Sequence, residues 1–220
     1  MSWMEKKRDN INKSFKYIDP RIPDLEFTDQ ETYYLSNPRD SVWRNRALRS
    51  LDVRHICDAY ACVGGDTVQF MAIKPRAQIH AVQIQDGDRF QRLENNIAKC
   101  RFLNPTCYAH CDSIENYIKS GACALVDFMY CDPPWMKSDT EWYTCDELVE
   151  NLHSEIAAPL SEAGCTPKYV CFKVPYEWET FNSVMDWFPS YTWMQSGTFH
   201  KKGYWIHIIA HKRMLFTNKT

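Results

Sequence analysis

Short apolar runs alternate with amphipathic segments along most of the chain, and this alternation predicts strands separated by helices. The apolar runs predict strands at residues 53–60, 78–85, 106–110, 125–131, 169–174, 191–197 and 204–212. Apolar residues three or four apart predict helices at residues 39–51, 66–73, 88–100, 113–119, 146–161 and 178–188. Repeated strand–helix alternation is typical of a mostly parallel sheet wrapped by helices on both faces.

The two ends of the chain differ from this regular middle part. Residues 198–203, Thr-Phe-His-Lys-Lys-Gly, form a hairpin-like turn between the last two predicted strands. Residues 1–38 are polar, with scattered aromatic residues and prolines. We therefore expect an α/β fold with a seven-stranded, mostly parallel sheet and an antiparallel final hairpin. We assign residues 1–50 to a short N-terminal helical extension, partly mobile, and residues 51–220 to the main domain.

The composition is that of an ordinary globular domain. Of the 220 residues, 45% are hydrophobic and 25% are charged, which is enough to bury a core. The formal net charge of −2 excludes a general cationic nucleic-acid binder, so any nucleic-acid contact must come from a local patch or pocket. The chain does not start with an apolar stretch of the signal-peptide type, so we expect an intracellular protein of the cytoplasm or nucleus, without a membrane partner.

Cysteine and histidine raise the question of a metal site. The ten cysteines include no Cys-x-x-Cys pair, which disfavours a zinc knuckle. Four of them lie in apolar runs, where cysteine behaves as a small buried hydrophobe: Cys57, Cys123, Cys131 and Cys171. His207 and His211 have the spacing of a helical metal pair, but their segment reads as a strand. We interpret them as two histidines on one strand face and expect no metal.

The first chemically informative segment joins a predicted strand to a predicted helix. Asp58 ends the strand, Gly64 and Gly65 lie in the turn, and Thr67 opens the helix. Glycines let a ligand approach the backbone, and a helix N-terminus offers N–H groups to a carboxylate. The Asp58 carboxylate can accept from a ligand ammonium. The pattern suits the amino-acid end of S-adenosylmethionine (SAM) better than a dinucleotide, since the three-glycine fingerprint is absent; a tight structural turn is the alternative.

The second segment is an apolar strand that ends in Asp132-Pro133-Pro134-Trp135. Two successive prolines fix the backbone and remove two N–H donors, which exposes carbonyl oxygens as acceptors. With the Asp132 carboxylate, these oxygens can hold both hydrogens of an sp2 amine, while a base stacks on Trp135. Because ligands of open α/β sheets bind beyond the carboxyl ends of strands, we expect both segments to face one crevice. A rigid loop with a buried tryptophan is the alternative.

Five segments are similar, in the same order, to motifs of the trimethylguanosine synthase family, the cap guanosine-N2 methyltransferases. They are Tyr-Tyr-Leu-Ser-Asn-Pro at 33–38, Asp-Ala-Tyr-Ala-Cys-Val-Gly-Gly-Asp-Thr-Val-Gln-Phe at 58–70, Glu-Asn-Asn at 94–96, His-Cys-Asp at 110–112 and Pro-Pro-Trp at 133–135. The resemblance spans about residues 30–180 and implies a Rossmann-like class I methyltransferase fold that uses SAM. It implies that Asp58, Gly64 and Thr67 line the methionine part of SAM. It also implies that Asp112 faces the adenine amine of SAM and that Trp135 stacks on the methylated guanine.

Three departures from the family pattern affect the expected site. The family's second strand ends in Asp-Ile-Asp, whose carboxylate holds the cofactor ribose. This chain has Gln83-Ile84-Gln85 instead, and Asp86 or Asp88 is the alternative carboxylate for the ribose. Asp132 replaces the family's serine, which brings the motif nearer to the adenine-N6 and ribosomal guanine-N2 enzymes. Met136 and Lys137 replace glycines after the tryptophan, which alters the rim of the cap pocket.

The candidate site residues follow from these segments and from the resemblance. The expected catalytic residues are Asp132, Pro133 and Trp135. The expected cofactor-binding residues are Asp58, Ala59, Gly64, Gly65, Thr67, Gln83, Gln85, Asp86 and Asp112. The expected substrate-binding residues are Tyr33, Tyr34, Trp135, Lys137 and Lys173.

Three functions fit these residues. The leading hypothesis is a SAM-dependent methyltransferase that acts on guanine N2 of RNA, with a 7-methylguanosine cap as the preferred acceptor. The second keeps this chemistry but changes the acceptor to adenine N6, or to guanine in structured RNA. The third is a degenerate methyltransferase fold that binds RNA or a protein partner without catalysis; Gln83 and Gln85 are its main support.

Overall fold

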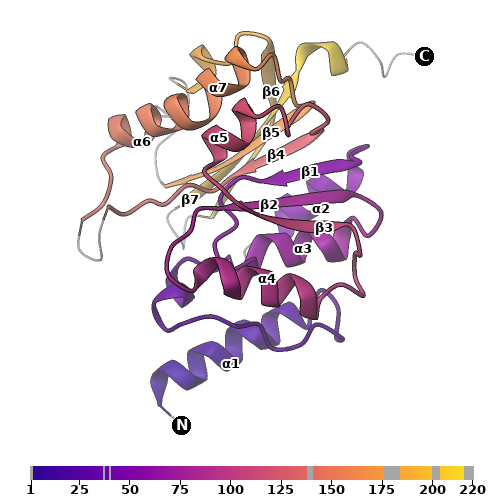
Figure 1. Ribbon diagram of the computed structural model, residues 1–220, viewed down its shortest axis with the longest axis vertical. Coiled ribbons are helices and arrows are strands. Elements are labelled where there is room, and N and C mark those ends of the chain that lie inside the picture. Colours follow the sequence, from indigo (N-terminus) through magenta and orange to yellow (C-terminus); the bar gives the residue numbers. More distant parts are fainter. Residues whose placement is uncertain are drawn as a thin grey trace. The chain divides into compact units, whose positions relative to one another are not determined.

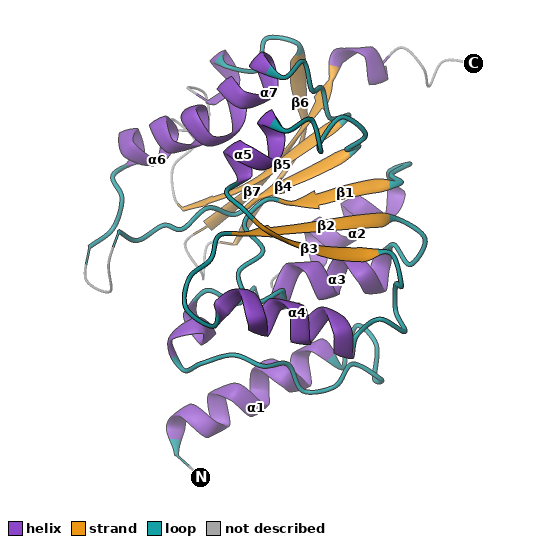
Figure 2. Cartoon of the chain, in the orientation of Figure 1, coloured by secondary structure: helices purple, strands orange, loops and turns teal. Residues whose placement is uncertain are grey.

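The computed structural model describes residues 2–36, 38–39, 41–137, 141–175, 184–199 and 204–215. The chain forms two compact units, Met1–Asp112 and Ser113–Thr220. Figure 1 follows the chain through both units, and Figure 2 distinguishes their helices and strands. The described residues contain seven strands, and helices separate most of them, which confirms the predicted α/β fold.

The first unit contains three parallel strands in the order β3-β2-β1. The strands are β1 (His55–Asp58), β2 (Gln78–Gln83) and β3 (Cys107–Cys111). The helical elements are α1 (Trp3–Phe15), η1 (Gln30–Tyr33), α2 (Val42–Ser50), α3 (Gly65–Ile73) and α4 (Arg89–Lys99). In Figure 1, α2, α3 and α4 lie on one side of these strands. Most residues of β1 and β2 are buried, as is typical of parallel strands joined through helices.

The second unit contains four strands in the order β4-β5-β7-β6. The strands are β4 (Phe128–Cys131), β5 (Tyr169–Pro175), β6 (Tyr191–Phe199) and β7 (Tyr204–His211). The pair β4–β5 is parallel, whereas β7 is antiparallel to both β5 and β6. The helical elements are α5 (Ile114–Lys119), α6 (Cys145–Leu152), the π-helix η2 (His153–Ala157), α7 (Ala158–Glu162) and η3 (Lys212–Leu215). The predicted antiparallel hairpin at the end of the chain is therefore confirmed.

The predicted strands and helices are confirmed within a few residues at each end wherever the structure describes them. Of the helix predicted at 178–188, residues 178–183 lie outside the described residues, and residues 184–186 are helical. Residues 200–203 of the predicted turn also lie outside the described residues. The division of the chain at residue 50 stays a prediction.

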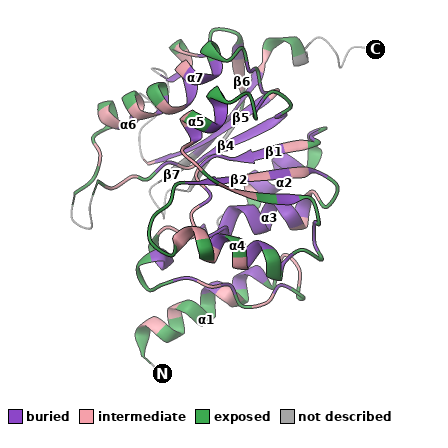
Figure 3. Ribbon diagram, viewed as in Figure 1, coloured by how far each residue is buried: buried purple, intermediate pink, exposed green. Residues whose placement is uncertain are grey.

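The helix α1 was not located from the sequence, although a helical extension was expected there. Its start carries a capping box, in which the Ser2 hydroxyl accepts from the Glu5 N–H at 3.1 Å and the Glu5 carboxylate accepts from the Ser2 N–H. This reciprocal pattern satisfies two N–H groups that a helix start leaves without partners. Ile11 and Phe15 are buried, while most other positions of α1 are exposed (Figure 3). The Ser-x-x-Glu spacing was the missed signal.

The cysteines of the apolar runs are buried, as predicted. His207 and His211 lie on β7, which confirms the strand interpretation. Burial lowers the pKa of His207 to about 4, so this imidazole is neutral at physiological pH. Among the helices that the structure describes, none is long and apolar enough to cross a membrane.

Candidate functional site

The turn between β1 and α3, residues 59–64, is the glycine loop of the first unit. Its backbone reaches the left-handed region twice, at Cys62 (φ 51°) and at Gly64 (φ 91°). Glycine adopts this conformation without strain, which explains Gly64. Gly65 begins α3, and a Cβ atom there would overlap the Leu35 Cδ2 atom. The glycine pair therefore serves both the turn and the close approach of the N-terminal segment.

Asp58 stands at the end of β1, directly before the glycine loop, and only 1% of its surface is exposed. The Thr67 hydroxyl donates a hydrogen bond of 2.6 Å to the Asp58 Oδ2 atom. Thr67 lies in the first turn of α3, so this bond fixes the strand end against the helix start. Ala59, the first loop residue, is also buried. The structure thus places Asp58, Gly64 and Thr67 around one short turn.

Gln83, at the end of β2, holds the glycine loop in place. Its Oε1 atom accepts from the Cys62 N–H at 2.8 Å, and its Nε2 atom donates to the Ile84 carbonyl at 3.1 Å. One residue earlier, the Val82 carbonyl accepts from the Ala61 N–H at 3.0 Å. The Gln83 side chain therefore supports the strained residue Cys62, a role that the sequence did not suggest.

The other polar candidates of the first unit lie after β2 and β3. Gln85 is exposed; it donates to the Gly87 carbonyl at 3.0 Å and accepts from the Cys111 thiol at 3.2 Å. Asp86 is exposed and pairs with Arg89. Asp112 follows β3, and its N–H donates to the Gln83 carbonyl at 3.2 Å. The strand ends thus bring Gln83 and Asp112 together, as expected for neighbouring parallel strands.

Asn96 connects the N-terminal segment to the glycine loop. Its Nδ2 atom donates to the carbonyls of Val63 at 2.8 Å and Glu26 at 2.9 Å, and its Oδ1 atom accepts from the Glu26 N–H at 2.7 Å. The side chain is fully buried, so these bonds offset the cost of removing an amide from water. Asn96 shares the apolar face of α4 with Leu93 and Ile97, and a polar residue on such a face signals a hydrogen-bonding role.

Glu31 fastens the segment that carries Tyr33 and Tyr34 to α4. Its carboxylate accepts from Arg92 at 2.7 and 3.0 Å and from the Thr28 N–H at 2.7 Å. Burial alone would raise the pKa of Glu31, but these hydrogen bonds and the charge of Arg92 lower it below its usual value. Tyr33 itself is 68% exposed, with the Lys7 ammonium 3.4 Å from its ring centroid. Tyr33 is therefore an exposed aromatic side chain on a segment that Glu31 holds against α4.

A buried polar network joins α2 to the start of α3. Arg44 has no exposed surface, forms an ion pair with Asp66, and donates to Gln69 Oε1 at 3.1 Å. Asn45 donates to the same oxygen at 2.8 Å, and Gln69 donates to the Ser36 carbonyl at 3.1 Å. Sequence reasoning missed this network. The available signal was Arg44 itself, because it precedes the buried Ala47 and Leu48 by three and four residues and so shares their helix face.

In the second unit, strand register explains how the Asp-Pro-Pro-Trp segment is held. Cys131 pairs with Phe172 between the parallel strands β4 and β5, so the next residues, Asp132 and Lys173, are neighbours. The Lys173 Nζ atom lies 2.6 Å from Asp132 Oδ2, and both side chains are about nine-tenths buried. The same ammonium lies 5.0 Å from the centroid of the Trp135 ring. Lys173 therefore contacts both side chains that were expected to orient the acceptor.

The segment after Trp135 turns back as a short antiparallel pair. The Tyr143 N–H donates to the Trp135 carbonyl at 3.0 Å, and Met136 pairs with Trp142. The Lys137 ammonium lies 2.5 Å from Glu147 and 3.3 Å from Glu141. Hydrogen bonds from Lys137 and from Thr144 lower the pKa of Glu147 to about 2. Lys137 is thus engaged by two carboxylates, and its contact with substrate stays a prediction.

Gln83 and Gln85 should respond differently to a restored carboxylate. The resemblance places position 85 beside the ribose of SAM; on that expectation, Gln85→Asp should tighten SAM binding by about fivefold, because a carboxylate accepts stronger hydrogen bonds from ribose hydroxyls. Gln83→Asp is one methylene shorter and withdraws the acceptor from the Cys62 N–H, so it should lower the melting temperature without tightening binding. Isothermal calorimetry and thermal unfolding measure the two effects. Equal tightening by both variants would contradict the structural role of Gln83.

The comparisons with known proteins establish the fold. No protein-family model and no curated protein sequence matches the chain. A delta-N METTL16 methyltransferase domain matches with a TM-score of 0.70 and 11% identity, over 94% of this chain and 96% of that one. The N-terminal domain of human METTL16 in complex with SAH matches with a TM-score of 0.65 and 11% identity, over 94% of this chain and 82% of that one. The methyltransferase domain of bacterial CtHen1-C matches with a TM-score of 0.59 and 11% identity, over 77% of this chain and 95% of that one. The chain therefore has the Rossmann-like α/β fold of methyltransferases, while the narrower resemblance to the trimethylguanosine synthases rests on the sequence motifs.

Proposed function

We propose that this chain transfers a methyl group from SAM to an exocyclic amine of an RNA base. The acceptor is guanine N2, and the preferred RNA carries a 7-methylguanosine cap. The observation that carries the proposal is the ion pair of Asp132 and Lys173 beside Trp135, at the carboxyl ends of two parallel strands. Ligands of Rossmann-like sheets bind at such strand ends. An aromatic face and an acceptor-only carboxylate are the groups that recognition of an amino-bearing base requires.

The first unit offers groups that fit the amino-acid end of SAM. The described residues provide no side-chain cap for α3, whose first turn begins at Gly65, so its N–H groups suit a carboxylate. The Asp58 carboxylate suits an ammonium; it accepts from Thr67 and has the capacity for further hydrogen bonds. SAH, which the domain of human METTL16 binds, is SAM without its transferable methyl group.

Asp132 and Trp135 would position the acceptor. SAM supplies the methyl group from a sulfonium, and the transfer depends mainly on the placement of the acceptor nitrogen in line with it. The Asp132 carboxylate would accept a hydrogen bond from an N–H of the amine and so direct the nitrogen lone pair toward the methyl group. It would also stabilise the positive charge that the nitrogen gains. Lys173 holds this carboxylate in one orientation. The proton that the nitrogen then loses passes to water.

The test is a methylation assay with methyl-labelled SAM and three matched RNAs. One carries a 7-methylguanosine cap, one carries no cap, and one carries a cap whose guanine is replaced by hypoxanthine, which lacks the 2-amino group. We expect transfer to the first RNA alone, with an N2-methylated product in nucleoside mass spectrometry. N6-methyladenosine as the product would move the acceptor to adenine. A folded chain that neither binds SAM at millimolar concentration nor methylates RNA would show that the protein is a degenerate methyltransferase without catalytic activity.

Trp135→Ala should weaken binding of the RNA acceptor by about 1–3 kcal/mol, the usual contribution of base stacking. The Michaelis constant for RNA should rise, while SAM affinity stays within a few-fold. Trp142→Ala is the matched control, because Trp142 lies in the same short antiparallel pair and is 53% exposed. Steady-state kinetics with capped RNA measures both variants. An unchanged Michaelis constant for Trp135→Ala would exclude stacking on this ring.

A further inference from the structure

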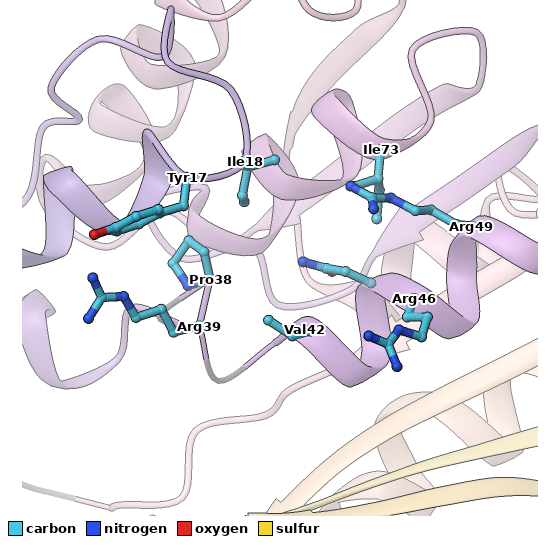
Figure 4. A pocket seen from close by; sticks show the side chains of 9 residues that line it. Tyr17, Ile18, Pro38, Arg39, Val42, Arg46, Arg49 and Ile73 are labelled. Carbon is cyan, nitrogen blue, oxygen red and sulfur yellow. The ribbon is translucent and has the colours of Figure 1, made fainter.

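A pocket of about 250 Å³ in the first unit lies apart from the glycine loop. It is lined by the turn after α1, by residues 38–39 and by one face of α2. In Figure 4, Tyr17 and Arg39 lie at one end of the pocket, and Arg46 and Arg49 extend from α2 at the other. Val42 and Ile73 add apolar side chains to its lining.

Positive charge is concentrated in this pocket. Three exposed arginines, Arg39, Arg46 and Arg49, line it, and none of the described lining residues is acidic. Two other exposed arginines of this unit pair with carboxylates: Arg8 with Asp29, and Arg21 with Asp19. Within the described part of the chain, Arg46 and Arg49 take part in no ion pair. Because the whole chain has a net charge of −2, the cluster is a local exception.

An exposed aromatic side chain completes the pocket. Tyr17 is 73% exposed, and the Arg39 guanidinium lies 4.6 Å from its ring centroid. Arg46 and Arg49 are three residues apart on α2 and therefore project from the same side of the helix. Guanidinium groups bind phosphates through paired hydrogen bonds, and exposed aromatic rings stack with unpaired bases. Guanidinium groups beside an exposed aromatic ring are typical of a surface that binds single-stranded nucleic acid.

We propose that this pocket binds a single-stranded segment of RNA, with phosphates on Arg46 and Arg49 and a base on Tyr17 beside Arg39. The choice of RNA as the nucleic acid rests on the proposed function. The site extends that function, because it would hold nucleotides of the substrate other than the methylated one. Its contribution is to affinity for RNA and to the Michaelis constant rather than to the chemical step.

Fluorescence anisotropy with a labelled single-stranded RNA tests the proposal. The double variant Arg46→Ala/Arg49→Ala should bind about tenfold more weakly, and its slope of log affinity against log salt should fall by about 1.4, since each phosphate contact to a single strand contributes about 0.7. Tyr17→Ala should weaken binding without changing this slope. Arg101→Ala removes an exposed arginine outside the pocket and should leave both quantities unchanged. Wild-type affinity and slope in the double variant would overturn the proposal, as would binding of a phosphopeptide in place of RNA.

The failure of this proposal can be told apart from the failure of the proposed function. If the chain methylates RNA and the double variant keeps the Michaelis constant for RNA, the pocket is not an RNA site and the methyltransferase function stands. If the chain transfers no methyl group but the double variant loses RNA binding, the pocket is confirmed and the enzymatic function fails. SAM affinity, measured by calorimetry, should be the same in all these variants.

Discussion

Asp132→Ala is expected to reduce the rate constant of methyl transfer by about 100-fold or more, while SAM affinity stays within a few-fold. Removing one group that stabilises developing charge commonly costs a factor of about 100–1000 in turnover. Cofactor affinity should persist because Asp132 is not among the residues proposed to bind SAM. Single-turnover transfer to capped RNA and calorimetry with SAM measure the two quantities.

The ion pair with Lys173 makes a second comparison necessary. Asp132→Ala leaves a buried ammonium without its carboxylate, and breaking such a pair often costs about 3–5 kcal/mol of stability. The double variant Asp132→Ala/Lys173→Met removes both charges, so it should regain most of the lost melting temperature but not the activity. Recovery of transfer in the double variant would show that Asp132 acts only by neutralising Lys173. Full activity in Asp132→Asn would likewise show that the hydrogen-bond acceptor at position 132 need not carry a charge.

The alternation of apolar runs was enough to predict the fold, because the periodicity of apolar and polar residues that indicates a strand or a helix lies within a short stretch of sequence. The start of α3 is an example: the Gly64-Gly65 pair and the strand before it identify a tight turn without any tertiary information. The pairing of Asp132 with Lys173 could not be predicted in this way. It depends on the register between β4 and β5, which are 41 residues apart at these positions. The sequence therefore predicts a substrate contact for Lys173, which stays a prediction, but not its pairing with Asp132.

The N-terminal segment shows a second limit of the sequence. Its connection to the glycine loop passes through the amide of Asn96, and its connection to α4 passes through Glu31 and Arg92. These bonds join residues 33 to 70 positions apart, and no local pattern identifies the partners. What the sequence does provide is the anomaly of a polar side chain on an apolar helix face. Such a residue must find hydrogen bonds when buried, even if its partner is unknown.

Asp58→Asn is expected to weaken SAM binding by about tenfold, because a hydrogen bond between an ammonium and a carboxylate is roughly twice as strong as one to a neutral amide. Asparagine keeps the size of the side chain and an oxygen that can accept from the Thr67 hydroxyl, so the turn should stay intact. Asp58→Ala should weaken binding further and also destabilise the fold, since it leaves the buried Thr67 hydroxyl without its acceptor. Calorimetry and thermal unfolding separate the two contributions.

The choice of ligand makes this prediction specific to the proposed contact. SAM and SAH both carry the amino-acid end, so Asp58→Asn should weaken both to the same extent. 5′-Methylthioadenosine has the nucleoside but not the amino-acid end, and its affinity should be unchanged. If all three ligands lose affinity equally, Asp58 acts by shaping the glycine loop, through its bond to Thr67 at the start of α3. If only the first two lose affinity, the buried carboxylate at the end of β1 is the group that holds the ammonium.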